Sequence, residues 1–500
     1  MAVLQKFKCF KKSKSKYMGK LLSFLAVLLV SASIINAQSN TIGPGIALSQ
    51  DGADANYINL GDVYNTINFP VSFEVWIYPT AFASPYNGIF ATDSKNSGNY
   101  YGFYVRITST GKLAFEIGDG TGAGSTDRRG KVTSTAIVLN TWTHIAVVAT
   151  SVTDIKFYFN GILQSAVNTD GSSAATNMVH NSNPAEYGRY ATQFDINNFQ
   201  GQMDDARLWT IARTETEIRA NMCHKLTGTE SGLAGYWNSD ESYLSSTVND
   251  LTIPAENGTV AGTVTKLTSS APIGDVSTYQ YVVDWSGITL SLNSPGGDKL
   301  KINKILNSPV GMHLYRVNSG PYYFDGLSGY TNYYYGVFSI NGATDAKYMA
   351  TYIYSLMNGI ATEDNEINSK LSIRNNSAVS TWGDAAATLN TTGNKLTKKN
   401  VTSIKEFIYN NVIPGGAKFE NGSEPVSINI YPNPATNYFT LANCSTDEKI
   451  ILVDLNGKSI EVKEELNGNV QQVSLVNVPK GIYFVYSLVS HQNLGKIVVQ

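Results

Sequence analysis

The sequence predicts an all-β protein made of three sandwich-like parts. Gly, Thr, Ser, Asn and Tyr are abundant and only 15% of residues are charged, which suits short strands and tight turns. Apolar and polar residues alternate along many short segments, as they do in half-buried strands. The pair Asn160-Gly161, between two such segments, is a strong hairpin signal because both residues tolerate positive φ.

The first 37 residues have the pattern of a secretory leader. A lysine-rich stretch precedes the apolar run 21–30, and we expect the signal peptide 1–37 to be cut before Gln38. Met18 is an alternative start that would leave a leader of ordinary length. The apolar run is too short to span a bilayer, which needs about 20 residues. Elsewhere no apolar run reaches that length, so we expect no transmembrane span in the mature chain.

Charge and cysteine content limit the partners and bonds to be expected. All seven leader charges are lysines, so cleavage changes the net charge from −2 to −9. Because nucleic-acid binding needs clustered Lys and Arg, we expect no nucleic-acid partner. The cysteines left, Cys223 and Cys444, are too far apart for a disulfide framework, and two unpaired thiols are favoured over a bridge between domains.

The first predicted sandwich begins with strand 57–60 and continues with strand 71–78. In the latter, Val71, Phe73, Val75 and Ile77 face one way, and Glu74, Trp76 and Tyr78 face the other. Further strands are expected at 101–107 and 112–117, joined by a hairpin turn, and at 142–148 and 155–163.

The stretch 199–222 changes from a strand pattern to a helix pattern. Its first half alternates, with one face made of Phe199, Gly201, Met203, Asp205, Arg207 and Trp209, and the other of Gln202, Asp204, Ala206 and Leu208. In the second half, Thr214 can cap a short helix with Glu215 and Glu217 in its first turn.

Several of these segments carry a family resemblance. The motif Phe-x-Gly-x-Met-Asp-Asp-Ala-Arg-Leu-Trp, the Phe-Glu-Val-Trp strand, the Trp-Thr-His-Ile-Ala strand and the Phe-Asn-Gly hairpin occur in order, followed by closing strands near 232–237 and 250–260. Together they resemble the laminin-G-like domains of secreted bacterial proteins. The resemblance implies a concanavalin A-like jelly-roll sandwich over residues 38–275.

A second sandwich is predicted over 276–413, after a linker at 272–275. Strand-like alternation favours an immunoglobulin-like arrangement. This part is rich in tyrosine, with ten within forty positions: Tyr315, Tyr322, Tyr323, Tyr330, Tyr333, Tyr334, Tyr335, Tyr348, Tyr352 and Tyr354.

The last part, 425–500, follows a Gly- and Asn-containing linker at 414–424. It carries three signatures, which are Tyr431-Pro432-Asn433-Pro434, Asp454 with Gly457-Lys458, and Gly481 and Tyr483 followed by Lys496. They resemble the type A C-terminal sorting domain of the type IX secretion system, a small β-sandwich. The resemblance implies that this domain partners the outer-membrane secretion machinery and directs the product to the cell surface or the medium.

Catalytic patterns are scarce. Glucanases of the concanavalin-type fold place carboxylates in a Glu-x-Asp-x-Glu-like pattern, and no Glu-x-Asp occurs in this chain. The five histidines show no His-x-x-x-His spacing that would suit zinc. We therefore expect a protein that is not an enzyme, with a divergent glycoside hydrolase as the alternative.

Calcium is the expected cofactor, in a structural role. Laminin-G-like sandwiches often hold it with oxygen ligands, and the candidates here are Asp51, Asp54, Asp204 and Asp205. The hypothesis is that Asp204 shares one ion with a carboxylate of the 51–54 loop. The alternative, of nearly equal weight, is that Asp205 and Arg207 pair with neighbours.

The predicted function is binding of an extracellular glycan or another extracellular ligand by the first sandwich. Aromatic rings stack on the apolar faces of sugars, and Tyr100, Tyr101, Tyr187 and Tyr190 are candidates in segments expected to be loops. A structural adhesin that uses protein contacts through the Tyr-rich segment 321–335 is a further alternative.

Overall fold

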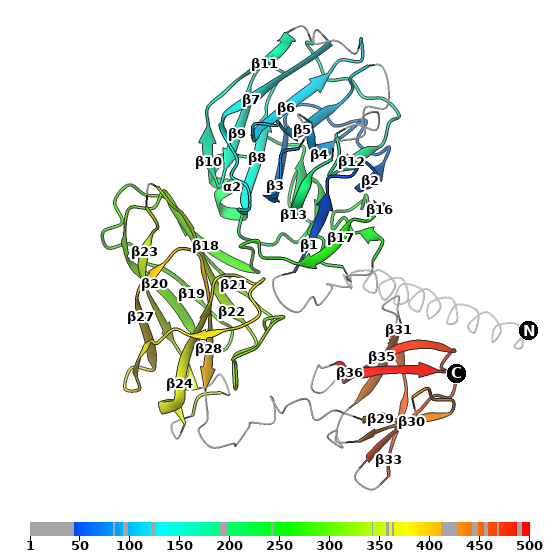
Figure 1. Ribbon diagram of the computed structural model, residues 1–500, viewed down its shortest axis with the longest axis vertical. Coiled ribbons are helices and arrows are strands. Elements are labelled where there is room, and N and C mark those ends of the chain that lie inside the picture. Colours follow the sequence, from blue (N-terminus) through cyan, green and yellow to red (C-terminus); the bar gives the residue numbers. More distant parts are fainter. Residues whose placement is uncertain are drawn as a thin grey trace, which may run out of the picture. The chain divides into compact units, whose positions relative to one another are not determined.

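The alternating segments are strands in a computed structural model of the chain (Figure 1). The structure describes residues 45–83, 86–93, 99–122, 127–173, 175–190, 198–241, 245–342, 344–356, 360–362, 365–411, 429–431, 433–442, 449–454, 459–467, 470–487 and 493–500. The predicted leader 1–37 and linker 414–424 lie outside these residues. The chain divides into two units, Met1–Asn410 and Asn411–Gln500.

The first sandwich consists of an eight-stranded and a nine-stranded antiparallel sheet. The eight-stranded sheet has the order β10 (Ile162–Gln164), β9 (Ile155–Phe159), β8 (Thr143–Ala149), β3 (Val71–Pro79), β13 (Gln200–Trp209), β1 (Ile46–Asp51) and β17 (Thr265–Thr268), with β14 (Leu233–Trp237) paired to β13. The nine-stranded sheet has the order β11 (Ala166–Ser173), β7 (Arg128–Ala136), β6 (Lys112–Gly118), β5 (Phe103–Ile107), β4 (Asn87–Ala91), β12 (Ala185–Tyr187), β2 (Tyr57–Gly61), β16 (Gly258–Ala261) and β15 (Thr247–Val248).

The hydrophobic core of this sandwich lies between the two sheets. Val71, Phe73, Val75 and Ile77 of β3 are buried in it, as the alternation predicts, together with apolar residues of β5 and β6. Helix α2 (Glu215–Asn221) begins at the predicted cap, where Thr214 and Glu217 form a reciprocal capping box. The predicted all-β class and helix cap are therefore confirmed.

The second sandwich consists of a six-stranded and a five-stranded sheet. Their strands in order are β18 (Val276–Gln280), β21 (Gly311–Val317), β22 (Tyr334–Ile340), β28 (Lys405–Asn411), β24 (Ser369–Arg374) and β25 (Gly383–Asp384), and then β19 (Leu290–Asn293), β20 (Lys299–Leu306), β23 (Lys347–Ile353), β27 (Lys395–Thr402) and β26 (Thr388–Asn390). A 3₁₀ turn lies at Glu366–Asn368.

The tyrosines of the second sandwich mostly build its core and do not form a surface. Tyr334, Tyr335, Tyr348 and Tyr352 are at most 1% exposed. Their hydroxyls find partners inside, as where Tyr352 donates to the buried Asp298 at 2.7 Å. Of the ten tyrosines, only Tyr322 is largely exposed. Buried tyrosine is favourable where the hydroxyl is hydrogen-bonded, which explains the composition without a tyrosine-covered surface.

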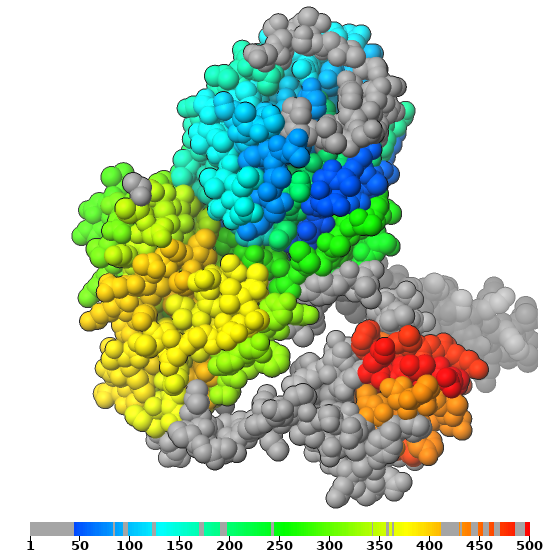
Figure 2. Space-filling model, in the orientation of Figure 1, coloured from blue at the N-terminus to red at the C-terminus, as the bar shows by residue number. Residues whose placement is uncertain are grey.

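The two sandwiches of the first unit share a buried seam (Figures 1 and 2). The Trp76 ring meets Phe338 edge to face at 5.3 Å, and the Tyr281 hydroxyl donates to the Asn160 carbonyl at 2.8 Å. A Cβ on Gly161 would lie 2.7 Å from the Arg219 side chain and 2.9 Å from the Tyr281 hydroxyl, so the hairpin needs glycine here. Ile273 is 2% exposed within this seam. The segment predicted as a linker at 272–275 is therefore packed, because its apolar side chain is covered.

The second unit has two four-stranded sheets. They are β29 (Asn429–Tyr431), β30 (Tyr438–Ala442), β34 (Val470–Ser474) and β33 (Lys463–Asn467), and then β32 (Ser459–Glu461), β31 (Ile450–Asp454), β35 (Gly481–Ser487) and β36 (Asn493–Val499). Phe439, Leu452, Val485 and Ile497 are among the residues of their common core.

Candidate functional site

The outer face of the nine-stranded sheet carries a cluster of charged and aromatic side chains. We name it the tyrosine–arginine cluster, and it consists of Tyr86, Tyr100, Tyr104, Arg106, Glu116, Arg128 and Tyr190. On β5, Tyr104 and Arg106 alternate with the core residues Phe103 and Val105. Period-two alternation thus places these polar side chains on the face that points away from the core.

Glu116 is the central charge of this cluster and is 1% exposed. Arg106 donates to it from Nε at 3.0 Å, and Arg128 Nη1 lies 4.0 Å from its other oxygen. Burial alone would raise the pKa of Glu116, but the two guanidinium groups outweigh it and hold the pKa below its usual value. Glu116 is therefore ionised at neutral pH.

Aromatic rings surround these charges. Tyr86 and Tyr190 stack with their centroids 5.2 Å apart. The Arg106 guanidinium lies 5.3 Å from the Tyr86 ring, and the Arg128 guanidinium lies 5.1 Å from the Tyr100 ring. Three buried polar atoms of the cluster have no hydrogen-bond partner among the described residues: Oε1 of Glu116, Nε of Arg128 and the hydroxyl of Tyr190. The cluster thus keeps both donor and acceptor capacity beside aromatic faces.

Of the four predicted ligand tyrosines, Tyr100, Tyr101 and Tyr190 lie outside the strands, as expected, and Tyr187 does not. Tyr187 lies in β12 and is buried within the core, so the prediction of a loop residue is wrong for it. Tyr190 is 1% exposed and Tyr100 is 8% exposed, both within the cluster. Tyr101 is partly exposed at the edge of the cluster, where its backbone N–H donates to the Tyr104 hydroxyl at 3.0 Å. Of the four, Tyr101 is the ring that reaches solvent.

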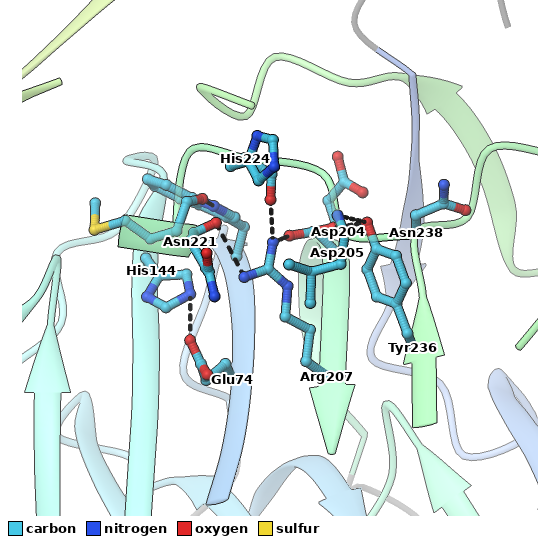
Figure 3. A network of polar contacts seen from close by, with 12 residues as sticks. Glu74, His144, Asp204, Asp205, Arg207, Asn221, His224, Tyr236 and Asn238 are labelled. Atoms are coloured by element: carbon cyan, nitrogen blue, oxygen red, sulfur yellow. Dashed lines mark hydrogen bonds and ion pairs between the residues drawn. The ribbon is translucent and has the colours of Figure 1, made fainter. Parts of the chain in front are cut away.

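A second polar cluster lies on the outer face of the eight-stranded sheet (Figure 3). We name it the Arg207 network. Arg207 is fully buried, is paired with Asp205, and donates to the carbonyls of Asn221 at 3.0 Å and His224 at 2.7 Å. The Tyr236 hydroxyl donates to the other oxygen of Asp205 at 2.7 Å. These contacts connect β13 and β14 to the end of helix α2.

This network depends on a bulge that alternation does not predict. Between β13 and β3, Asp204 is opposite Trp76 and Arg207 is opposite Glu74, so β13 has one extra residue at that point. Asp205 has φ 57° there. Met203 is consequently in the core while Arg207 is outside it, and the prediction that both share one face is wrong beyond Asp204.

The predicted calcium ligands are not brought together. In the β1–β13 pair, Asp51 is opposite Gln200 while Asp204 lies four residues further along, a separation of about 13 Å at about 3.3 Å per residue. Asp204 accepts from Ser269 at 2.5 Å, and Asp54 lies 3.4 Å from Arg189. A shared ion needs its oxygens about 2.3–2.6 Å from the metal, so the register places Asp51 too far from Asp204 to share one. Sharing with Asp54 stays a prediction, although Asp54 is engaged by Arg189.

Asp51 and Asp205 are also engaged by protein groups. Asp51 accepts from Ala53 N–H and from the Asn56 amide, and Asp205 has the pairing with a neighbour that the alternative described. Among the described residues, no group of three or more His, Cys, Asp or Glu is placed to hold a metal ion. Calcium bound in another way stays a prediction.

The sorting signatures lie partly outside the described residues. This applies to Pro432, Gly457 and Lys458, and to the side chains of Tyr431 and Asp454. Asn433, Pro434 and Lys496 are exposed, and Tyr483 is buried, with its hydroxyl donating to the Pro479 carbonyl at 2.8 Å. Gly481 opens β35.

Two family models match this chain. Residues 51–219 match the concanavalin A-like lectin/glucanases superfamily, and residues 429–500 match the secretion system C-terminal sorting domain. The chain carries a laminin-G-like domain and a type IX sorting domain. Both predicted resemblances are confirmed, and the sorting domain indicates export across the outer membrane to the cell surface or the medium. In the part of the chain that the structure describes, no helix is both long and apolar enough for a membrane span.

Solved structures match at low similarity, and no curated protein matches. A protein from Bacteroides ovatus, whose carbohydrate binding is itself a proposal, is 24% identical at a TM-score of 0.35, over 47% of this chain and 62% of its own. A SAP-like pentraxin from Limulus polyphemus is 15% identical at a TM-score of 0.26, over 35% of this chain and 81% of its own. The CBM40 of a Ruminococcus gnavus sialidase, bound to sialyllactose, is 12% identical at a TM-score of 0.26, over 35% of this chain and 96% of its own. The chain thus spans less than two thirds of the first of these proteins.

Proposed function

We propose that this laminin-G-like protein is exported and binds carbohydrate, without cleaving it, at the tyrosine–arginine cluster. The observation that carries the proposal is the pairing of aromatic faces with polar atoms that have no hydrogen-bond partner among the described residues, on Glu116, Arg128 and Tyr190. A sugar offers C–H faces for stacking and hydroxyls that both donate and accept, so it matches both features.

The test uses the mature chain, residues 38–500, on a glycan array. Arg128→Ala removes a donor from the cluster, and Tyr101→Ala removes its partly exposed ring. Each is expected to weaken binding about tenfold, which corresponds to about 1.4 kcal/mol. Tyr438→Ala is the matched control, because Tyr438 is an exposed tyrosine, 46% exposed, in the sorting domain.

Two results would overturn the proposal. Binding that survives both cluster variants would place the ligand elsewhere, and no binding across the array would exclude the glycans displayed on it. Release of reducing sugar from polysaccharides by the mature chain would favour the divergent glycoside hydrolase instead.

An adhesin that works by protein contacts has one favourable observation. Tyr322 and Phe324, in the Tyr-rich segment, are 45% and 56% exposed. The main chain beneath them is fixed, because Trp382 donates from Nε1 to the Tyr323 carbonyl at 2.9 Å and from its backbone N–H to the Asp325 carbonyl at 2.8 Å. Loss of cell attachment in the double variant Tyr322→Ala/Phe324→Ala, with glycan binding intact, would favour this alternative.

A further inference from the structure

Two signatures of the sorting domain, more than sixty residues apart in sequence, meet at one edge of a sheet. Strand β36 is the last strand of its sheet and pairs with β35 on one side. On its other side lies the Asn433-Pro434 segment. Asn433 Nδ2 donates to the Lys496 carbonyl at 2.7 Å, and the Val498 N–H donates to Asn433 Oδ1 at 2.9 Å.

The contact continues through the backbone. The Ala435 N–H donates to the Val498 carbonyl at 2.8 Å, and the Gln500 N–H donates to the Ala435 carbonyl at 2.8 Å. Four outward-facing main-chain groups of the terminal segment are therefore satisfied by residues 433–435. An open edge strand is otherwise a template for pairing with another chain, so these bonds protect it.

Asparagine is suited to this position by its chemistry. Its side-chain amide carries a donor and an acceptor side by side, as a peptide group does. The next residue, Pro434, has no N–H to offer, so the main chain cannot supply a donor at that point. The Asn433 side chain supplies it to the Lys496 carbonyl instead.

We infer that Asn433 is a positioning residue of the sorting signal: it closes the free edge of β36 and fixes the chain end in the form presented to the secretion machinery. Its role is carried by the two bonds to the terminal strand. The exposed Lys496 side chain belongs to the segment that these bonds hold. The inference concerns the second unit alone and does not depend on carbohydrate binding by the first.

The test compares two variants, Asn433→Ala and Asn433→Asp, with the control Asn437→Ala. Hydrogen exchange is measured on residues 38–500, and export is measured on residues 1–500, which include the predicted leader. Asn437 is an exposed asparagine nearby whose backbone carbonyl accepts from the Leu475 N–H, which makes it a matched control. Hydrogen exchange should show the Val498 amide losing protection at least tenfold in Asn433→Ala. The externally located fraction of the protein should fall severalfold in a host with the secretion system, and Asn437→Ala should match the wild type in both measurements.

Asn433→Asp keeps the acceptor for Val498, but at neutral pH its carboxylate has no proton to donate and faces the Lys496 carbonyl, so their repulsion should loosen the contact and lower protection at Val498. When protonated, this variant can donate again from its carboxyl. Its protection factor at Val498 should therefore recover toward the wild-type value between pH 7 and pH 3, a rescue that general unfolding of the tail would not give. The inference is overturned if Val498 protection is unchanged in Asn433→Ala, if export is normal although protection is lost, or if Asn433→Asp shows no recovery in acid.

Discussion

The two outer faces of the first sandwich carry polar clusters of the same residue types, yet the clusters are connected differently. In the Arg207 network, the guanidinium donates to main-chain carbonyls of Asn221 and His224 as well as to a carboxylate. In the tyrosine–arginine cluster, the described contacts of Arg128 run to Glu116 and to the Tyr100 ring and hydroxyl, all of them side chains.

We interpret this difference as that between a cluster that holds the fold and a cluster that, by our proposal, binds a ligand. Arg207 binds the carbonyls of Asn221 and His224, on either side of Met222 and Cys223, which lie in the seam with the second sandwich. Within the ranges that the structure describes, the Arg128 side chain makes no bond to the main chain, and the unpartnered atoms of its cluster lie beside stacked rings. The Arg207 network also has buried atoms without a hydrogen-bond partner among the described residues, at Nε of Arg207 itself and on the neighbouring Glu74 and His144. It lies beside the buried seam, where the His144 ring meets Trp76.

The largest effect is expected from Arg207→Ala. The change leaves Asp205 buried without its cation and releases two main-chain carbonyls, so we expect a loss of about 3–5 kcal/mol in the free energy of unfolding. Chemical denaturation of the mature chain measures it. Lys370→Ala is the control, because Lys370 and Asp384 form an ion pair that is almost half exposed, where a loss of less than about 1 kcal/mol is expected. A loss for Arg207→Ala as small as that of the control would contradict a structural role.

The sequence predicts which side chains face outward in these two clusters only where the strands are regular, and the bulge at Asp205 interrupts this pattern. The alternation of β3 correctly places Glu74 outside and Phe73 inside, and the helix cap at Thr214 is local enough to be recognised. The extra residue at Asp205 has no such local signal, since aspartate tolerates positive φ without requiring it. Burial of Tyr190 likewise depends on distant strands, which a one-dimensional pattern does not bring together.

The second effect is acid sensitivity of the seam that the Arg207 network supports. Burial lowers the pKa of His313 from its usual value to about 3, and burial together with Arg207 lowers the pKa of His144. A histidine whose folded pKa is depressed stabilises the protein above the unfolded pKa of about 6.5, and this contribution is lost as pH falls toward the folded pKa. Between pH 7 and pH 5, His313 alone should lower the free energy of unfolding by about 2 kcal/mol.

The comparison of wild type with His313→Gln isolates the contribution of His313 to the pH dependence of stability. Asp204 and Glu74 have raised pKa values through burial, so their own contributions change in the opposite direction as pH falls. Denaturation at pH 7 and pH 5 should show that the wild type loses about 2 kcal/mol more than the variant does. Equal losses in the two proteins would mean that His313 is accessible to protons in the folded state.

A smaller effect is expected for Asp204→Asn. Burial and the neighbouring Asp240 and Asp205 carboxylates raise the pKa of Asp204 well above its usual value, which favours the protonated form that an amide resembles. An amide can still accept from Ser269, so Asp204→Asn should lower the free energy of unfolding by less than about 1 kcal/mol. Asp205→Asn should lower it more, because that change breaks the pair with Arg207. A chelator that lowered the melting midpoint of the wild type, but not of Asp204→Asn, would restore Asp204 as a calcium ligand.

The smallest stability effect is expected for Arg128→Ala, and it sharpens the comparison most. Arg128 is 4.0 Å from Glu116 and its side chain is 17% exposed, while Arg106 continues to hold the carboxylate at 3.0 Å. The free energy of unfolding should therefore fall by less than about 1 kcal/mol, although glycan binding falls about tenfold. Stability and binding measured on one preparation decide between the two roles. If stability drops as far as in Arg207→Ala, both clusters serve the fold, and the ligand must be sought on another surface.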